Sequence, residues 1–386
     1  MQNNKPRVVR VVTASYVVPW HLGNTLKRIT NDFDVCVVGQ DVSIYAKDYP
    51  GVEWVDIGLN RKISPVADFI SLIKLIRFLW SYKPDIVHSI MPKAGLLTAL
   101  AGILSFVPVR IHTFTGQVWV GKKSGFKRIF YVFDWLINKL NTVCLTDSPS
   151  QSKFLFDFGI SHYGKPLPVL GSGSLSGVDL SRFNVDQISY NAAALSEELD
   201  ISEENFVFAF IARKTRDKGA FDVIHAFSRL VKHYPNCLLL FVGPDESDGE
   251  LEALLVEEPA LFKQVISVGQ VDNHAAYLAI ADVLCLPSYR EGFGTIVIDA
   301  AAMGKPTIGS DIVGLVDSIE NQKTGLLFPA GDVDALTKAM MTFLESPDQL
   351  ETMGVVARKR VEKFFSADIL YSELKNLYFQ FYQQPF

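Results

Sequence analysis

The chain has 386 residues, of which 48% are apolar and 20% charged, and its formal net charge is −5. This length fits two α/β domains of ordinary size, and the composition is that of a globular rather than a disordered protein. The acidic balance argues against a nucleic-acid-binding protein, and no apolar run is long enough for a transmembrane helix.

The first half of the chain alternates short β-branched runs with helical stretches. Strands are predicted at 8–12, 35–38, 85–88, 110–113 and 142–146, and helices at 64–82 and 93–104. This alternation is typical of βαβ units and a parallel sheet. A glycine-rich loop at 171–177 and a polar stretch at 181–204 follow, and they indicate a domain boundary. We therefore predict an N-terminal Rossmann-like domain over residues 1–180.

The same pattern restarts after the boundary. Strands are predicted at 206–211, 237–242, 265–268, 283–286, 307–308 and 325–328, and helices at 220–233, 294–303 and 332–345. We predict a second Rossmann-like domain over 181–365, and a terminal helix over 366–386 that packs back toward the N-terminal domain. Ligands of such sheets bind at the carboxyl ends of the strands, which here predicts a cleft that both domains face.

The most informative segment follows the predicted strand 283–286. Gly292 and Gly294 let the backbone approach a ligand closely, and a helix begins near Thr295. The free N–H groups and the positive dipole end of a helix start suit a diphosphate. Glu291 and Asp299 flank this start, and as carboxylates they suit sugar and ribose hydroxyl groups rather than phosphate. An ordinary strand–loop–helix with a capping acid is the alternative.

A second loop of this kind follows the predicted strand 206–211. Arg213 and Lys218 would place two cations at the carboxyl end of the sheet, as a departing diphosphate requires. Read alone, the loop also fits a solvated basic turn. Two such loops in one domain favour a diphosphate site. No GxGxxG follows the first strand, which argues against a dinucleotide dehydrogenase, and no His/Cys/Asp cluster has the spacing of a metal site.

These segments resemble the nucleotide-sugar-dependent glycosyltransferases of family 4, which have the GT-B fold. The resemblance covers nearly the whole chain and is strongest over 206–332. It implies that Arg213 and Lys218 neutralise the donor diphosphate, and that Glu291 opens the family's E-x7-E motif and faces the donor sugar; these three are the expected catalytic residues. Asp299 stands where the family has a second Glu, and its shorter side chain would bind the ribose. The expected donor-binding residues are Gly243, Pro287, Gly292, Phe293, Gly294, Thr295 and Asp299.

The first half resembles, over 86–96 and 109–119, the bacterial members that extend polyprenyl-diphosphate-linked sugars. The expected acceptor-side residues are Lys93, His112, Thr115 and Gly116. Thr115 stands where many members have a histidine, and His112 lies three residues earlier. A lone histidine on a strand is often structural, so the residue that contacts the reacting sugar stays open.

A basic amphipathic segment occurs between the predicted strands of the first half. Its cations are Lys122, Lys123, Lys127 and Arg128, and its aromatic residues are Phe126, Phe130 and Trp135. This composition suits the surface of an anionic membrane, and a solvated face above a packed aromatic stripe is the alternative. The four cysteines lack CxxC spacing and no signal peptide is visible. We therefore expect a cytoplasmic protein, peripheral at the inner face of the cytoplasmic membrane.

The resemblance implies a retaining glycosyltransferase of O-antigen or other polysaccharide biosynthesis. It would move a hexose or N-acetylhexosamine from a UDP-sugar to a polyprenyl-diphosphate-linked saccharide, without a metal or other cofactor. Two alternatives remain open. A UDP-sugar epimerase would convert free UDP-sugar in the absence of acceptor. A non-catalytic nucleotide-sugar-binding subunit would bind UDP and transfer nothing.

Overall fold

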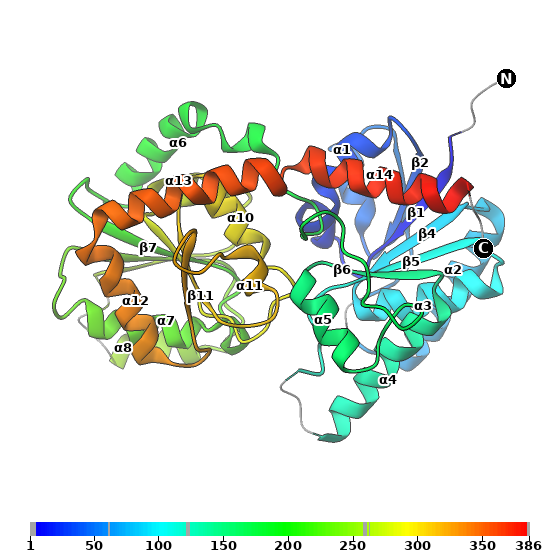
Figure 1. The fold of residues 1–386 in the computed structure, drawn as a ribbon, viewed down its shortest axis with the longest axis horizontal. Helices are drawn as coiled ribbons and strands as arrows, with labels where there is room; N and C mark the ends of the chain where they lie inside the picture. Colours follow the sequence, from blue (N-terminus) through cyan, green and yellow to red (C-terminus); the bar gives the residue numbers. More distant parts are fainter. Residues whose placement is uncertain (1–4, 61, 121–123, 258–260, 262, 384–386) are drawn as a thin grey trace. The chain divides into compact units, whose positions relative to one another are not determined.

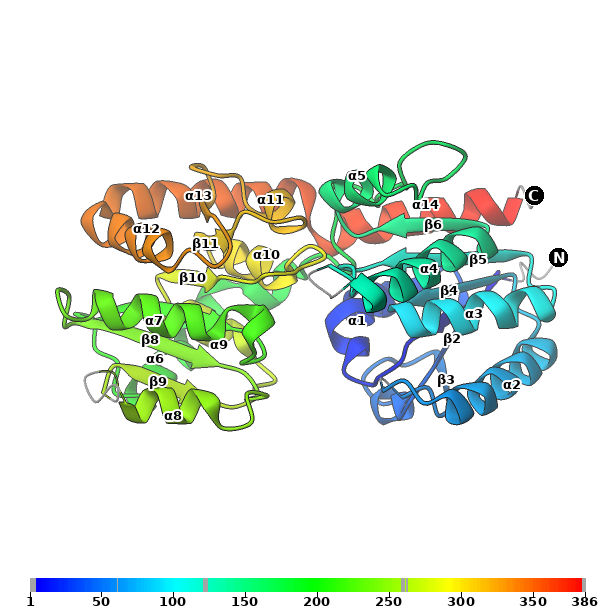
Figure 2. The same ribbon diagram turned by 90° about the horizontal axis from the view of Figure 1, so that it is seen from below.

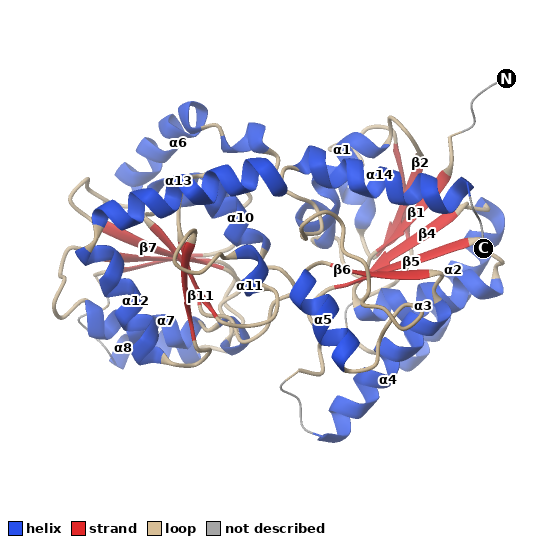
Figure 3. Cartoon of the chain, in the orientation of Figure 1, coloured by secondary structure: helices blue, strands red, loops and turns tan. Residues whose placement is uncertain are grey.

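The computed structural model describes residues 5–60, 62–120, 124–257, 261 and 263–383, which form two compact units (Figure 1). Unit 1 comprises Met1–Gly177 with Ala367–Phe386, and unit 2 comprises Val178–Ser366. Each unit has one six-stranded parallel sheet with helices on both faces (Figure 3). The structure confirms the predicted fold class of two Rossmann-like parallel-sheet domains.

The sheet of unit 1 has the strand order β3-β2-β1-β4-β5-β6. Its strands are β1 (Arg7–Val11), β2 (Asp34–Gly39), β3 (Val52–Asp56), β4 (Ile86–Ile90), β5 (Val109–Phe114) and β6 (Val143–Thr146). In the register of the central strands, Val8 lies opposite Val35 on one side and Ile86 on the other. The central strands are buried β-branched runs, as expected for a parallel sheet covered on both faces.

Helices cover both faces of this sheet. They are η1 (Val18–Leu22), α1 (Gly23–Ile29), η2 (Val42–Tyr45), α2 (Pro65–Tyr82), α3 (Pro92–Leu104), α4 (Ser124–Leu140), α5 (Pro149–Asp157) and α14 (Ala367–Gln383). Val8 of β1 packs in one cluster with α1 and α14, whereas Val9 and Val11 pack in another with α2 and α3. Helices α2, α3 and α4 lie side by side along unit 1 (Figure 2).

The sheet of unit 2 has the strand order β12-β11-β10-β7-β8-β9. Its strands are β7 (Phe206–Ile211), β8 (Cys237–Val242), β9 (Val265–Val268), β10 (Val283–Leu286), β11 (Thr307–Ser310) and β12 (Gly325–Phe328). Its helices are η3 (Leu180–Phe183), α6 (Val185–Glu198), η4 (Arg216–Lys218), α7 (Ala220–Leu230), α8 (Glu250–Glu257), α9 (His274–Ile280), α10 (Thr295–Ala302), α11 (Leu315–Ser318), α12 (Val333–Glu345) and α13 (Pro347–Phe364). Phe208 and Phe210 pack with α7 and α12, and Leu284 and Leu286 pack with α10 and α13.

Several elements differ from the sequence prediction. The polar stretch 181–204 contains the helices η3 and α6, because Phe183, Ile188 and Ala192 bury an apolar face in unit 2. Strand β3 was not predicted. Only Val52 of this strand is buried, and Glu53 and Asp56 are exposed, so neither face is a continuous apolar run. The structure of the described residues has no helix with both the length and the apolarity needed to cross a membrane.

Candidate active site

Two loops meet at the carboxyl ends of the neighbouring strands β7 and β10 in unit 2. Val283 of β10 lies opposite Phe208 of β7, so the loops that follow these strands are adjacent. Gly219 has a φ of +72°, and a Cβ at this position would lie 2.1 Å from the carbonyl oxygen of Pro287. Tyr289 also donates its backbone N–H to the carbonyl of Asp217, at 2.9 Å. Only glycine allows this close contact, which brings the two predicted site loops together.

An ion pair joins the two loops through predicted catalytic residues. Lys218 Nζ donates to Glu291 Oε1 at 2.5 Å, and Ser288 Oγ donates to the same oxygen at 2.8 Å. The side chains of Lys218 and Glu291 are 18% and 13% exposed, so each needs a partner in this setting. The pair therefore holds an ammonium group and a carboxylate at the carboxyl edge of the sheet, with limited access to solvent.

Arg213 lies in the first loop but has different partners. Its Nη1 donates to Glu246 Oε2 at 2.7 Å, and its Nη2 lies 3.9 Å from Asp217 Oδ2. The next residue, Lys214, is buried, and its Nζ donates to Ser267 Oγ at 2.8 Å and to a backbone carbonyl at 3.0 Å. Burial lowers the pKa of Lys214, with a smaller opposing effect from Asp245. Lys214 thus holds the loop in place through its buried side chain. Among the described residues, no hydrogen bond joins Arg213 to Glu291.

A glycine in a left-handed conformation precedes α10, the helix at whose start the sequence predicts a diphosphate site. Gly294 precedes the helix with a φ of +78°, and a Cβ there would meet Leu315 at 2.6 Å. Thr295 begins the helix and is partly exposed, as is Gly292. Phe293, predicted to contact the donor, has a buried side chain that packs on Phe365 with ring centroids 5.3 Å apart. The Phe293 side chain is therefore part of the core of unit 2.

Two other predicted donor residues have mainly backbone roles. Gly243 has a φ of +134°, and a Cβ there would lie 1.9 Å from the carbonyl oxygen of Ala212. Pro287 is buried and forms the wall against which Gly219 packs. Both positions keep the loops after β7, β8 and β10 close together. The described residues of the chain contain no group of three or more His, Cys, Asp and Glu side chains arranged to hold a metal ion.

Asp299 has a partner that the sequence did not reveal. His274 Nε2 lies 3.0 Å from Asp299 Oδ2, and the two side chains are 28% and 13% exposed. His274 begins α9, which packs beside α10. His274 is a single histidine at the start of a short helix and belongs to no sequence motif. Only the packing of α9 on α10 identifies it as the partner of Asp299.

The predicted acceptor-side residues lie in unit 1, where two of them have structural partners. Lys93 Nζ donates to the carbonyls of Asn60 and Lys62, at 2.8 and 2.7 Å, and forms an ion pair with Asp68. The ring of His112 is completely buried, and its Nδ1 lies 2.9 Å from Ser89 Oγ. Burial lowers the pKa of His112 to about 3, which keeps the ring neutral. The His112 ring therefore does not reach the surface of unit 1.

The remaining acceptor-side residues, Thr115 and Gly116, directly follow β5 and are partly exposed. Close to them in the chain, Trp119 is buried and its Nε1 donates to Asp134 Oδ2 at 2.8 Å. Burial raises the pKa of Asp134 to about 6, against smaller opposing hydrogen bonds from Trp119 and Gln117. This buried acid supports the loop that carries the two predicted residues.

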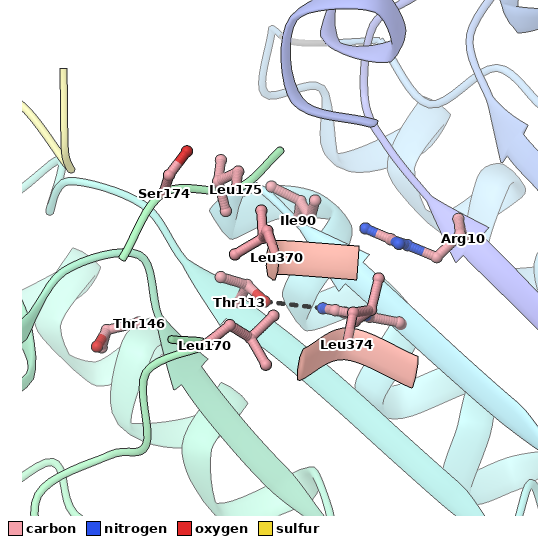
Figure 4. A pocket seen from close by; sticks show the side chains of 10 residues that line it. Arg10, Ile90, Thr113, Thr146, Leu170, Ser174, Leu175, Leu370 and Leu374 are labelled. Carbon is pink, nitrogen blue, oxygen red and sulfur yellow. Dashed lines mark hydrogen bonds between the residues drawn. The ribbon is translucent and has the colours of Figure 1, made fainter. Parts of the chain in front are cut away.

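A small cavity occurs in unit 1 between the strand ends and α14. Its lining includes Arg10, His88, Thr113 and Leu374, and Figure 4 shows the Arg10 side chain directed into it from β1. Arg10 is buried, and its Nε and Nη1 make no hydrogen bond to the described residues. His88 bonds to Thr113 Oγ1 at 2.8 Å and to the hydroxyl of Tyr378 at 2.7 Å. The space holds about one water molecule, so we assign it no larger ligand.

The predicted membrane segment forms part of α4. Lys122 and Lys123 lie outside the described residues. Lys127 Nζ lies 5.7 Å from the ring centroid of Trp119, within cation–π range. Phe126 and Trp135 are exposed, whereas Phe130 is only partly so. The segment therefore combines exposed aromatic side chains with a packed one.

Comparison with known proteins identifies relatives of the whole chain. Residues 192–360 match the family Glycosyl transferases group 1. The capsular polysaccharide biosynthesis glycosyltransferase CapM of Staphylococcus aureus is 29% identical over 395 residues, covering 100% of this chain and 99% of the relative. The UDP-Gal:alpha-D-GlcNAc-diphosphoundecaprenol alpha-1,3-galactosyltransferase of Escherichia coli is 27% identical over 328 residues, covering 83% of this chain and 81% of that protein. The crystal structure of Anabaena HepE in complex with UDP and glucose has the same fold, with a TM-score of 0.81 at 16% identity, covering 97% and 100% of the two chains.

Proposed function

We propose, on the premise that this chain is a glycosyltransferase with a group 1 domain and the GT-B fold, that it extends a lipid-linked saccharide. The donor would be a UDP-sugar carrying a hexose or N-acetylhexosamine. The acceptor would be a polyprenyl-diphosphate-linked saccharide of O-antigen or capsule biosynthesis. The names of the two curated relatives support this choice, since one concerns capsular polysaccharide and the other a diphosphoundecaprenol-linked GlcNAc.

The observation that carries the proposal is the pairing of Lys218 with Glu291 beside the start of α10. One loop contributes a cation, the other a carboxylate, and the helix contributes backbone N–H groups, all in unit 2. Cleavage of the donor's anomeric C–O bond leaves negative charge on the diphosphate and positive charge on the sugar. Lys218, Arg213 and the amides near Thr295 would stabilise the leaving diphosphate, because preorganised donors act most strongly where water is limited.

Glu291 and Asp299 would bind hydroxyl groups of the donor. Glu291 is already oriented by Lys218 and Ser288, which leaves its second oxygen for a sugar hydroxyl. Asp299, with His274, would contact the ribose. The acceptor hydroxyl would attack the anomeric carbon with retention, while an oxygen of the departing phosphate takes the acceptor proton. The bond to the acceptor oxygen forms as the bond to the diphosphate oxygen breaks, so no other reactant is required.

A lipid-linked acceptor requires the enzyme to work at a membrane surface. We place the protein at the inner face of the cytoplasmic membrane, where nucleotide sugars are available. Exposed Phe126 and Trp135 on α4, beside Lys127 and Arg128, support peripheral contact with anionic lipid.

One experiment tests the proposal and its alternatives together. The protein is incubated with UDP-glucose, UDP-galactose or UDP-N-acetylglucosamine, with or without a polyprenyl-diphosphate-linked monosaccharide, and the products are weighed by mass spectrometry. We expect the acceptor to gain the mass of one sugar with one of the donors. Altered UDP-sugar without acceptor would instead indicate an epimerase. UDP binding without any product would indicate a binding subunit.

A further inference from the structure

Helix α2 carries apolar side chains on two opposite faces. Its inner face packs on the sheet of unit 1 through Leu75 and Leu79, which are buried. Its outer face carries large apolar side chains at helical spacing, and they are exposed to solvent; they are Val66, Phe69, Ile70 and Trp80. The outer stripe from Val66 to Trp80 extends about 21 Å along the helix axis, and Arg77 is exposed on the same face between Ile70 and Trp80. An amphipathic helix normally exposes polar residues on such a face, and among the described residues this stripe has no apolar partner.

The end of α3 continues this apolar surface. Trp80 Nε1 donates to the carbonyl of Leu104 at 3.2 Å, which joins the ends of the two helices. Ile103 and Leu104 are exposed, and Phe106, in the turn that follows, is 85% exposed. We call the outer stripe of α2 together with Ile103, Leu104 and Phe106 the α2–α3 face.

Phe106 occupies a backbone position that normally selects glycine. Its φ is +56°, its N–H bonds to the carbonyl of Ile103, and the N–H of Val107 bonds to the carbonyl of Gly102. These two bonds define a Schellman motif with Phe106 at the C′ position, where glycine is preferred because a Cβ is strained. Phe106 therefore combines a strained backbone with a mostly exposed aromatic ring. Strain of this kind is common where a side chain binds a partner.

The charges beside the apolar stripe are positive. Lys74 and Arg77 are exposed on α2, and Lys83 is exposed immediately after it. The acid of this helix, Asp68, is mostly buried and paired with Lys93. This local excess of cations contrasts with the net charge of −5 for the whole chain. A surface of aromatic, aliphatic and basic side chains fits the interface of an anionic bilayer.

We propose that the α2–α3 face docks on an anionic phospholipid bilayer, with Phe106 and Trp80 entering the interfacial layer. The proposal deepens the proposed function, on which it rests, by naming a second surface of unit 1, besides α4, that meets the membrane of the lipid-linked acceptor. A second copy of the chain suits this face less well. A two-fold contact would bring two copies of the same cation-bearing patch together, because such an interface repeats the same patch on both sides.

Vesicle co-sedimentation tests the proposal. The parent protein and its variants are mixed with vesicles of phosphatidylcholine alone, or with 30% phosphatidylglycerol, at 0.1 M and 1 M NaCl. We expect binding to the anionic vesicles at 0.1 M salt and weaker binding at 1 M, where charge screening shortens to about 3 Å. Phe106→Gly should reduce binding several-fold, and Phe106→Gly with Phe69→Ser at least tenfold.

The Phe106→Gly variant separates docking from folding. Glycine is the preferred residue at this C′ position, so the variant should unfold at a temperature no lower than that of the parent. Tyr163→Gly is the matched control in unit 1, since Tyr163 is also exposed and has a φ of +49°. The control should bind vesicles like the parent, and both variants should keep full turnover with a short water-soluble acceptor analogue.

Three results would overturn the proposal. In the first, the parent fails to sediment with anionic vesicles while still transferring sugar to the soluble acceptor, which would leave the proposed transfer reaction intact. Phe106→Gly and the double variant could bind as well as the parent, which would exclude this face. Alternatively, analytical ultracentrifugation could show that the parent is a dimer and that Phe106→Gly is a monomer, which would make the face a contact between copies. Loss of transfer with both acceptors, but unchanged vesicle binding, would count against the proposed function alone.

Discussion

Replacing Lys218 by methionine tests the central element of the proposed site. Methionine keeps much of the length of the lysine side chain but removes the ammonium group that bonds to Glu291 Oε1 at 2.5 Å. If this group stabilises the leaving diphosphate, turnover should fall by about 10²–10³, the usual effect of losing one charge-stabilising donor. The KM for the donor should change less, because the charge on the diphosphate increases mainly in the transition state.

The same substitution has a calculable effect on stability. Lys218 and Glu291 are 18% and 13% exposed, so removing the lysine leaves a mostly buried carboxylate with Ser288 as its remaining partner. A buried group that loses its partner costs about 1–3 kcal/mol. The double variant with Glu291→Gln has no unpaired charge, so it should be less destabilised than Lys218→Met alone. Lower activity combined with this recovery of stability would separate the catalytic role from the structural one.

The assay combines steady-state transfer, with donor concentration varied, and thermal unfolding of the same preparations. Lys338→Met is the matched control, since Lys338 lies on α12 of unit 2 and is exposed. It should change neither turnover nor stability. If Lys218→Met had the turnover of the parent enzyme while remaining folded, Lys218 would have no role in stabilising the diphosphate, and the site would need a different assignment.

Three other predictions use different parts of the structure. Asp299→Ala should raise the donor KM more than it lowers kcat, and His274→Ala should do the same to a smaller extent. Glu291→Ala should mainly lower kcat. If kinetics measured at varied donor concentration showed the opposite pattern, the roles of the two carboxylates would be exchanged. Sugar transfer should continue in EDTA, because Arg213, Lys218 and the amides of α10 supply the positive charge that the diphosphate needs. Activity that disappears on chelation and returns with Mg²⁺ would contradict this prediction. The pKa of Asp134 is raised from 3.8 to about 6 by burial, so the folded state binds the proton more tightly and stability falls as the pH rises from about 4 to about 6. Asp134→Asn should therefore match the parent in thermal unfolding at pH 4 and exceed it at pH 7.5 by up to about 3 kcal/mol, and equal differences at both pH values would refute the buried-acid assignment.

Most strands of the two sheets were predictable because their sequences are short apolar runs, whereas β3, with Glu53 and Asp56 exposed, was missed. The predicted ranges 206–211, 237–242 and 283–286 coincide with β7, β8 and β10. Helix α6 was missed because polar residues are spread along its whole length, and its apolar contacts come from a few positions such as Ile188 and Ala192. Its stability depends on packing within unit 2 rather than on an evident amphipathic pattern.

The candidate site was predictable to the extent that it depends on strand–loop–helix order. Lys218 and Glu291 are 73 residues apart, and the adjacency of β7 and β10 is what brings them together. Their direct pairing could not be predicted, because the sequence does not specify which strands are neighbours. The partner of Asp299 was missed for the same reason, since His274 reaches it only through the packing of α9 beside α10.

The exposure of the α2–α3 face could not be predicted from its sequence. The sequence predicts a helix over 64–82, and a helix with apolar residues on both faces is normally buried on both. Only one face of α2 has a protein partner among the described residues, and the stripe from Val66 to Trp80 is exposed. Phe106 belongs to the same face and has a mostly exposed aromatic side chain at a position that normally selects glycine. A membrane supplies the apolar environment that both features require, and it also attracts the cations beside them.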